Sequence, residues 1–219
     1  MEETFRQFDN AMMPENRDIR AAALAELKGN WTQPVLCTLV YVIVTGAASM
    51  LFSSIHEVCN LAFGILVATP LGFGFIITFL NYMRGIDRDD MVGKPFMCFK
   101  NYGRFLGVSA LYIVYIFLWT LLFIIPGIIK SYSYAMTPYI MHENPQLSGE
   151  DCINASMKMM DGNKGKLFLL DLSFIGWIIL GVLTLGIGLL WVEPYMMCSR
   201  AKFYEELKAR QIGQTNQNW

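Results

Sequence analysis

Three ionisable side chains interrupt long apolar stretches of this sequence: Lys130, Asp171 and Glu193. Lys130 is the only charged residue between Phe105 and Met141. An ionisable group at membrane depth is costly unless it has a partner or reaches the surface, so such residues are candidates for ion pairs, proton transfer or a polar path. The three residues therefore form a candidate intramembrane polar site.

Relative depths follow from the rise of a straight α-helix, about 1.5 Å per residue. On this scale Lys130 lies close to an external turn, Asp171 close to the inner surface, and Glu193 is the least able to reach water. One interpretation is a Lys130–Glu193 ion pair between neighbouring hairpins, and the other is two independent side chains that extend to the interface. If Asp171 instead faced Glu193, one carboxyl would keep its proton, which suits proton-coupled chemistry.

The composition places these residues in a membrane protein. The chain has 219 residues, of which 54% are hydrophobic and only 16% charged, whereas soluble domains carry about 25% charged residues. A net charge of −1 gives no basic excess for nucleic-acid binding. The five cysteines are scattered without a metal-ligand or disulfide spacing.

Sequence motifs for catalysis are missing as well. HExxH, GxSxG, P-loop and GxGxxG patterns do not occur in the chain. We therefore expect no catalytic residue, no cofactor and no metal site, and a protein that is not an enzyme.

The apolar segments indicate the helices that must position the three ionisable residues. A crossing needs about 20 apolar residues, and the candidates are 33–53, 59–82, 105–125, 126–141, 167–183 and 186–199. Helix breaks are expected at Pro70, Gly72, Pro126, Gly127, Gly186 and Gly188. The fold class is therefore an all-α polytopic membrane protein with six transmembrane or re-entrant helices in three hairpins. Because 126–141 and 186–199 are short, full crossing and re-entry both stay open.

The basic residues predict the orientation. Of the 17 Lys and Arg residues, all but Lys130 fall in segments on one side of the six-helix arrangement. Since basic residues concentrate in cytoplasmic loops, both termini are expected in the cytoplasm. The polar start of the chain predicts no cleavable signal peptide. The domains expected are a polar tail at 1–15, one membrane domain at 16–208 and a polar tail at 209–219.

Three similar segments precede the odd-numbered helices: "LKGNWTQPVL", "FKNYGRFLGV" and "MDGNKGKLFLL". Upstream of the first, Ile19, Ala23 and Leu27 share one helical face, and Gly29 suits a left-handed helix end. Upstream of the third, Ser148 and Asp151 form a potential capping box. We expect three units, each an amphipathic cytoplasmic stub followed by a membrane hairpin. The alternative is that such turns recur independently.

Helix packing has one further signal, a ladder of small residues at Gly64, Ala68 and Gly72. Small residues four apart allow two helix backbones to approach closely in a membrane. The ladder indicates packing inside the chain, with a dimer face as the alternative.

Two stretches, "PGIIKSYSYAMTPYIMHENPQLSGEDCINASMKMMDGNK" and "LFLLDLSFIGWIILGVLTLGIGLLWVEPY", carry a resemblance. There the sequence resembles a family of bacterial integral membrane proteins catalogued as domain of unknown function 975, with similarity from about Ile19 to Lys208. It is more distantly similar to the membrane domain of some glycerophosphodiester phosphodiesterases. The resemblance implies a multi-pass protein of the bacterial cytoplasmic (inner) membrane and no activity. Phosphodiesterase activity does not carry over, because this sequence lacks the soluble catalytic domain.

These observations favour a non-catalytic envelope or lipid-interacting membrane protein. Its expected partners are membrane lipids, with a homo-oligomer or another membrane protein as further candidates and no nucleic acid. The alternative is a small transporter or permeability module with a polar path near Lys130 and Glu193. An intramembrane enzyme is the least supported class.

Overall fold

The computed structural model describes residues 13–86 and 88–217, the last five by backbone alone. Every regular element in these residues is a helix, so the prediction of an all-α chain is confirmed. Most of the expected N-terminal tail, at 1–12, lies outside the described residues. At the other end α12, Leu189–Gln217, continues past the boundary expected at residue 208.

Four helical stretches in the described residues are long and apolar enough to cross a membrane. They are α3 (Thr32–Ile55), the continuous stretch Glu57–Met83, α6 (Tyr102–Leu122) and the stretch Lys164–Leu183. The second comprises α4 (Glu57–Phe63), η1 (Gly64–Ala68) and α5 (Thr69–Met83), and the fourth comprises α10 (Lys164–Leu172) and α11 (Ile175–Leu183).

The fourth and sixth expected spans differ from the prediction. The segment 126–141 is divided between α7, Ile124–Tyr134, and α8, Thr137–Glu143. The segment 186–199 is a turn followed by the first third of α12. Four stretches of the described residues therefore have the length and composition of a crossing, and the expected six transmembrane or re-entrant helices are not confirmed.

The helix break expected at Pro70 and Gly72 does not occur, because a π-helical turn at Gly64–Ala68 carries the helix past the proline. Proline has no N–H, so the carbonyl four residues earlier loses its helical partner. That carbonyl, Leu66 O, instead accepts a hydrogen bond from the Tyr102 hydroxyl at 2.8 Å. The stretch from Glu57 to Met83 is consequently continuous.

The two later turns are tight. The chain leaves α6 at Phe123, whose backbone is extended, and α7 begins at Ile124, so Pro126 lies inside the first turn of α7. The α11–α12 turn has left-handed backbone at Leu185, with φ 56°, and at Gly186, with φ 85°. Here the Gly188 N–H donates to Thr184 Oγ1 at 2.8 Å.

Three short helices precede α3, α6 and α10: α2 (Asn16–Leu27), η2 (Lys94–Phe99) and α9 (Gly149–Met159). As predicted, α2 buries Ile19, Ala23 and Leu27, and Gly29 after it has φ 86°. The Ser148 hydroxyl caps α9 by accepting from the Asp151 N–H at 3.1 Å, also as predicted. However, η2 is a 3₁₀ helix of only 6 residues, so the three-fold repeat stays a prediction.

The small-residue ladder does not have one common neighbour. A Cβ added at Gly64 would meet nothing within 4 Å, and one at Gly72 would lie 3.4 Å from the Tyr41 hydroxyl of α3. The closest approach is at Gly74, where an added Cβ would collide with the Pro95 carbonyl of η2. The tightest packing on this helix is therefore two residues beyond the ladder.

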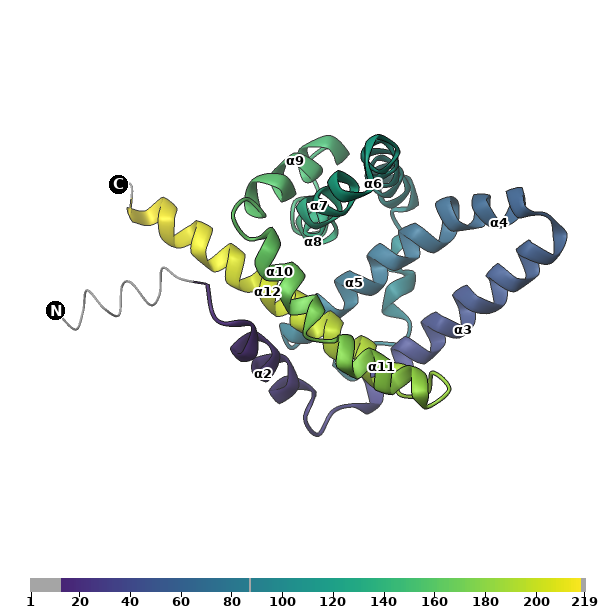
Figure 1. Cartoon of the computed structure of the whole chain (residues 1–219), viewed down its shortest axis with the longest axis horizontal. Helices are drawn as coiled ribbons and strands as arrows, with labels where there is room; N and C mark the ends of the chain where they lie inside the picture. Colours follow the sequence, from purple (N-terminus) through teal and green to yellow (C-terminus); the bar gives the residue numbers. More distant parts are fainter. Residues whose placement is uncertain (1–12, 87, 218–219) are drawn as a thin grey trace.

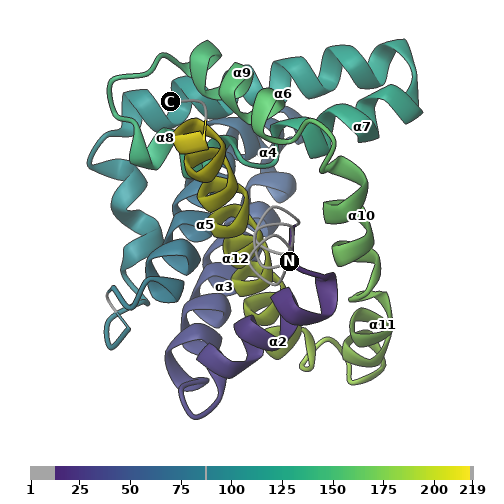
Figure 2. The same cartoon turned by 90° about the vertical axis from the view of Figure 1, so that its left-hand side faces the viewer.

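Helices α5, α8 and α12 pack around the centre of the molecule, with α2 along α12 (Figures 1 and 2). The rings of Tyr139 and Tyr204 stack there with centroids 4.8 Å apart. We call α6 and α7 together the α6–α7 hairpin (residues 102–134). It is seen nearly end-on in Figure 1 and lengthwise in Figure 2, so it runs across the direction of α3, α5 and α12.

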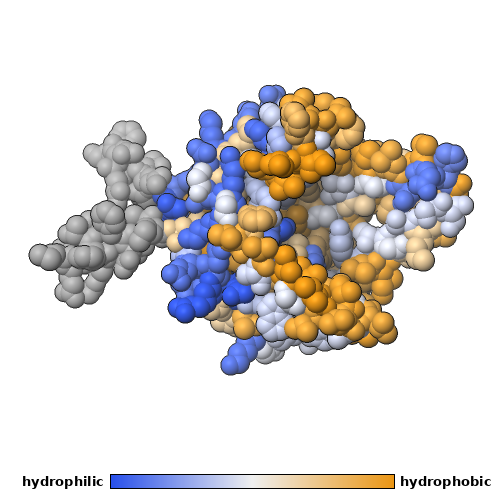
Figure 3. Space-filling model, viewed as in Figure 1, coloured by the Kyte–Doolittle hydropathy of each residue, from blue (hydrophilic) through white to orange (hydrophobic). Residues whose placement is uncertain are grey.

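The apolar helices are poorly covered by the protein. Only 11%, 17% and 22% of the most apolar windows of α3, α6 and Lys164–Leu183 are buried, against 56% for Glu57–Met83. Figure 3 shows hydrophilic residues over α2, α9 and the C-terminal part of α12, and hydrophobic residues over α10, α11 and the α6–α7 hairpin. The polar and apolar surfaces are thus separated.

Candidate functional site

The three ionisable residues singled out in the sequence do not form one site. Lys130 lies on α7, and its ammonium is 4.6 Å from the ring centroid of Trp119 and 6.0 Å from that of Tyr134. It also donates to Met157 Sδ of α9 at 3.8 Å. Glu193 is not among its contacts, so the ion pair expected from depth alone is absent.

The missing Lys130–Glu193 contact has a structural reason. The depth count assumed one straight helix from 126 to 141, whereas the chain bends at Ala135–Met136 and the α6–α7 hairpin runs across the other long helices. The ammonium lies beside α9, one helical turn from Pro126 at the hairpin tip, and its depth in a membrane stays a prediction.

Asp171 is paired with Arg200. Arg200 Nε donates to Asp171 Oδ1 at 2.9 Å, and a terminal guanidinium nitrogen donates to Oδ2 at 2.7 Å. The Asp171 side chain is only 13% exposed. This bidentate geometry is the strong form of the Arg–carboxylate interaction, and it connects α10 with α12.

Glu193 lies half-buried on the first part of α12. Its electrostatic neighbours are Arg200 and Tyr41, and the described residues give its carboxyl neither a hydrogen bond nor an ion pair within contact distance. Asp171 binds Arg200, and no hydrogen bond among the described residues joins Asp171 to Glu193, so the structure does not bring the two carboxyl groups together.

A second charged cluster, which the sequence reasoning missed, surrounds Glu143 at the end of α8. Tyr204 donates to Glu143 Oε2 at 2.7 Å, and Lys208 donates to Oε1 at 2.9 Å, both from α12. Arg84, which follows α5, also donates to Glu143 and reaches Glu205 at 2.7 Å. We call these five residues the Glu143 network. It connects α5, α8 and α12.

The Glu143 network shifts the pKa values of its members. Burial raises the pKa of Glu143, but the hydrogen bonds from Arg84, Lys208 and Tyr204 outweigh burial and hold it below its usual value. Burial and the hydrogen bond to Glu143 raise the pKa of Tyr204. Next to the network, burial and the charge of Arg84 lower the pKa of His142. The cluster is therefore a set of closed ion pairs at neutral pH.

The family of the chain follows from its match to a family model described as "Protein of unknown function (DUF975)", which covers residues 12–133 and 121–211. The chain belongs to this family. Neither the curated proteins nor the solved structures contain a match. The DUF975 family thus implies no activity, and the function of its polar residues has to be argued from their geometry.

Four pockets of this DUF975 chain show where a ligand has room. The largest, about 830 Å³, is an open hollow lined by residues 120–126 at the tip of the α6–α7 hairpin. One of about 380 Å³ lies between α6 and the start of α9, and one of about 270 Å³ lies beside Arg84. The fourth, about 20 Å³, is next to Arg200. Glu193 lines none of these four pockets.

The sequence held a weak signal for the Glu143 network. Tyr204, Glu205 and Lys208 lie within one turn of a charged helix, a pattern typical of a solvated surface. The pattern does not include the partners Arg84 and Glu143, which are distant in the sequence. Arg84 follows α5, and Glu143 is the last residue of α8. Only the packing of three helices brings them together.

Proposed function

We propose that this DUF975 protein is a non-catalytic, lipid-interacting protein of the bacterial cytoplasmic membrane that crosses it several times. The observation that carries this proposal is the exposed apolar surface of α3, α6 and α11. At the tip of the α6–α7 hairpin, residues 121–125 are each between 64% and 73% exposed. Contiguous apolar surface of this extent is unfavourable in water and favourable against lipid chains.

The backbone of the exposed turns supports the same proposal. A chain in lipid has to satisfy its own backbone polar groups, since no water is present to do so. The Gly127 N–H donates to Phe123 O at 3.1 Å, and the Gly186 N–H donates to Gly181 O at 3.1 Å. Together with the bond from Gly188 to the Thr184 hydroxyl, these contacts make both apolar turns compatible with a lipid environment.

The charged clusters support a structural and not a catalytic role. Asp171 binds Arg200, and Glu143 binds Arg84 and Lys208, so each carboxylate has a cation that holds two helices together. We propose that the Glu143 network lies on the cytoplasmic side, because its Arg84 and Lys208 belong to the basic segments expected there, and that both termini lie on that side.

A small transporter is the second candidate, favoured by one observation. Glu193 has no hydrogen-bond or ion-pair partner among the described residues, and an unpaired carboxyl near the membrane is a functional-site hypothesis by default. A transporter would need Glu193 to face a hydrated path, and its test is a flux measurement that responds to Glu193→Gln.

The experiment that separates these functions uses the full-length protein released from native membranes in mild detergent. We expect its native mass spectrum to contain phospholipid adducts. These adducts should survive the collisional activation that removes the detergent. In liposomes we expect the protein to carry no ion or proton flux above that of empty vesicles. A spectrum free of lipid would contradict the proposal, and a flux that Glu193→Gln abolishes would favour transport.

A further inference from the structure

Lys130 is a cation without an anion. Its contacts are the Trp119 ring, the Tyr134 ring and the Met157 sulfur, and no carboxylate within residues 13–86 and 88–217 forms an ion pair with it. A charge in apolar surroundings is costly unless a counter-ion or water accompanies it. The Lys130 side chain, next to the apolar hairpin tip, is therefore able to bind an anionic partner.

The depth of Lys130 relative to the membrane surface can be inferred from the position of α9, because α9 lies along α6. At its start, Gly149 approaches α6 so closely that an added Cβ would be 2.9 Å from the Leu111 side chain. Near its end, Met157 contacts Lys130, whose ammonium lies over Trp119 of α6. The interval from Gly149 to Met157 and the interval from Leu111 to Trp119 both rise about 12 Å. The two helices thus run side by side.

Helix α9 is amphipathic and charged at both ends. It buries Ile153 and Ser156, and it exposes Glu150, Asp151 and Lys158. A helix with charged residues in its first and last turns is accommodated in the interface plane and not through the hydrocarbon core. Because α6 and α7 run along it, the α6–α7 hairpin lies in that plane too, consistent with its direction across α3, α5 and α12 in Figures 1 and 2. On this arrangement α6 is long and apolar enough to cross a membrane but lies along its surface.

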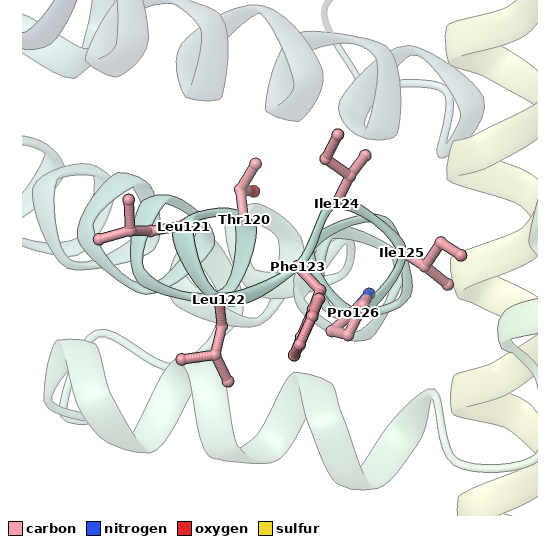
Figure 4. A pocket seen from close by; sticks show the side chains of 7 residues that line it. All are labelled: Thr120, Leu121, Leu122, Phe123, Ile124, Ile125 and Pro126. Carbon is pink, nitrogen blue, oxygen red and sulfur yellow. The ribbon is translucent and has the colours of Figure 1, made fainter.

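An apolar hollow begins one helical turn from Lys130. Pro126 lies four residues before Lys130 and so on the same helix face, and it lines the hollow of about 830 Å³ at the hairpin tip. In Figure 4 the side chains of Leu122, Phe123 and Pro126 extend on one side of the tip. The polar atom of Thr120 is satisfied inside the chain, since its hydroxyl donates to Ile116 O at 2.8 Å. The hollow is suited to a hydrocarbon chain.

We propose that Lys130 binds the phosphate of an anionic phospholipid whose acyl chain lies in the hollow formed by residues 120–126. The proposal rests on the proposed lipid-interacting function and names the lipid class and the residue. The ammonium supplies the positive charge, Trp119 and Tyr134 flank it at the level where aromatic residues gather at membrane interfaces, and α9 holds it at the headgroup level. Lys130 then lies on the same side as the other basic residues.

The test uses full-length protein in nanodiscs of phosphatidylcholine that contain a minority of phosphatidylglycerol, with lipid retention read by native mass spectrometry. Lys130→Gln removes the charge and keeps a polar side chain, Lys130→Arg keeps the charge, and Lys100→Gln is the matched control on an exposed lysine. We expect Lys130→Gln to lower the preference for phosphatidylglycerol about fivefold. Lys130→Arg and Lys100→Gln should leave the preference unchanged.

The outcomes are distinguishable. Equal loss in Lys100→Gln would show general electrostatics and would overturn the Lys130 site, as would an unchanged preference in Lys130→Gln. In both cases retained phospholipid would leave the proposed function standing, whereas a wild-type protein that retains no lipid would contradict that function itself. Displacement of phosphatidylglycerol by inorganic phosphate would assign the site to a free anion and overturn the lipid assignment.

Discussion

Arg200 of α12 holds the carboxylate of Asp171 of α10 through two hydrogen bonds, of 2.9 and 2.7 Å. The pair is largely shielded from solvent, because the Asp171 side chain is 13% exposed. Removing one partner of such a pair leaves the other charge without compensation. The pair therefore explains why an acidic residue is tolerated at the eighth position of α10, inside the apolar stretch Lys164–Leu183.

Replacement of Asp171 should destabilise the fold. We expect Asp171→Asn to lower the free energy of unfolding by about 2 kcal/mol, the range for hydrogen bonds to charged groups. Asp18→Asn is the control, since Arg17 and Asp18 are 3.8 Å apart and exposed. It should change stability by less than about 0.5 kcal/mol. Unfolding of the detergent-solubilised protein by SDS measures both, and equal effects would contradict the importance of the pair.

The Glu143 network gives a second stability prediction. Glu143→Gln keeps the shape of the side chain but removes the charge that binds Arg84 and Lys208, so we expect a loss of about 2 kcal/mol. Asp161→Asn removes an acid that is 87% exposed and should have little effect. The midpoint of thermal unfolding in detergent reports the difference, and an unchanged midpoint for Glu143→Gln would refute the role of the network.

Stability should also depend on pH through two groups. The folded-state pKa of Glu143 lies below its ordinary 4.5, so its contribution is complete above about pH 4.5 and is lost as the pH falls through the lower folded value. The pKa of His142 lies below 6.5, mainly because the side chain is buried. As the pH falls below about 6.5, His142 binds a proton more readily in the unfolded chain than in the folded protein, so the free energy of unfolding decreases.

Variants separate the two windows of this pH dependence. His142→Gln should flatten the decline that begins near pH 6.5, and Glu143→Gln should flatten the decline below about pH 4.5. Thermal midpoints measured from about pH 3 to about pH 8 test both. Stability that rises toward acid would have the wrong sign for this account.

The tight α11–α12 turn should not accept a larger residue at Gly188. An added Cβ there would lie 2.8 Å from the Gly181 Cα and 2.9 Å from Thr184 Oγ1. We expect Gly188→Ala to cost about 1–3 kcal/mol through overpacking. Gly176→Ala, on α11 with nothing within 4 Å, should be neutral or stabilising by up to about 1 kcal/mol. Unfolding by SDS compares them, and equal stability of the two variants would argue against the close turn.

The sequence predicts the parts of this fold that depend on local patterns. The buried face of Ile19, Ala23 and Leu27, the left-handed Gly29 and the capping of α9 by Ser148 all depend on near neighbours in the chain. Apolar length likewise predicts the stretches α3, α6 and Glu57–Met83. These features need no knowledge of tertiary packing.

Tertiary packing decides what the sequence could not. Pro70 is a helix break by its own chemistry, yet the hydroxyl of Tyr102 satisfies the Leu66 carbonyl that the proline leaves free, although Tyr102 is 36 residues from Leu66 in the chain. Depth counting placed Glu193 within reach of Lys130, because a count along the chain cannot show that the α6–α7 hairpin runs across the other helices. The partner of Asp171 is likewise supplied by α12, 29 residues later.

The central claim is that the exposed apolar faces of this protein contact lipid, and spin labels on the reconstituted full-length chain test it most directly. Labels at Val42 on α3, Phe117 on α6 and Ile179 on α11 occupy positions that are 50–62% exposed. The account predicts high collision rates with oxygen, which dissolves in lipid, and low rates with a water-soluble nickel chelate. Labels on the exposed Asp161 should show the reverse. High nickel accessibility at all three apolar positions would contradict the account.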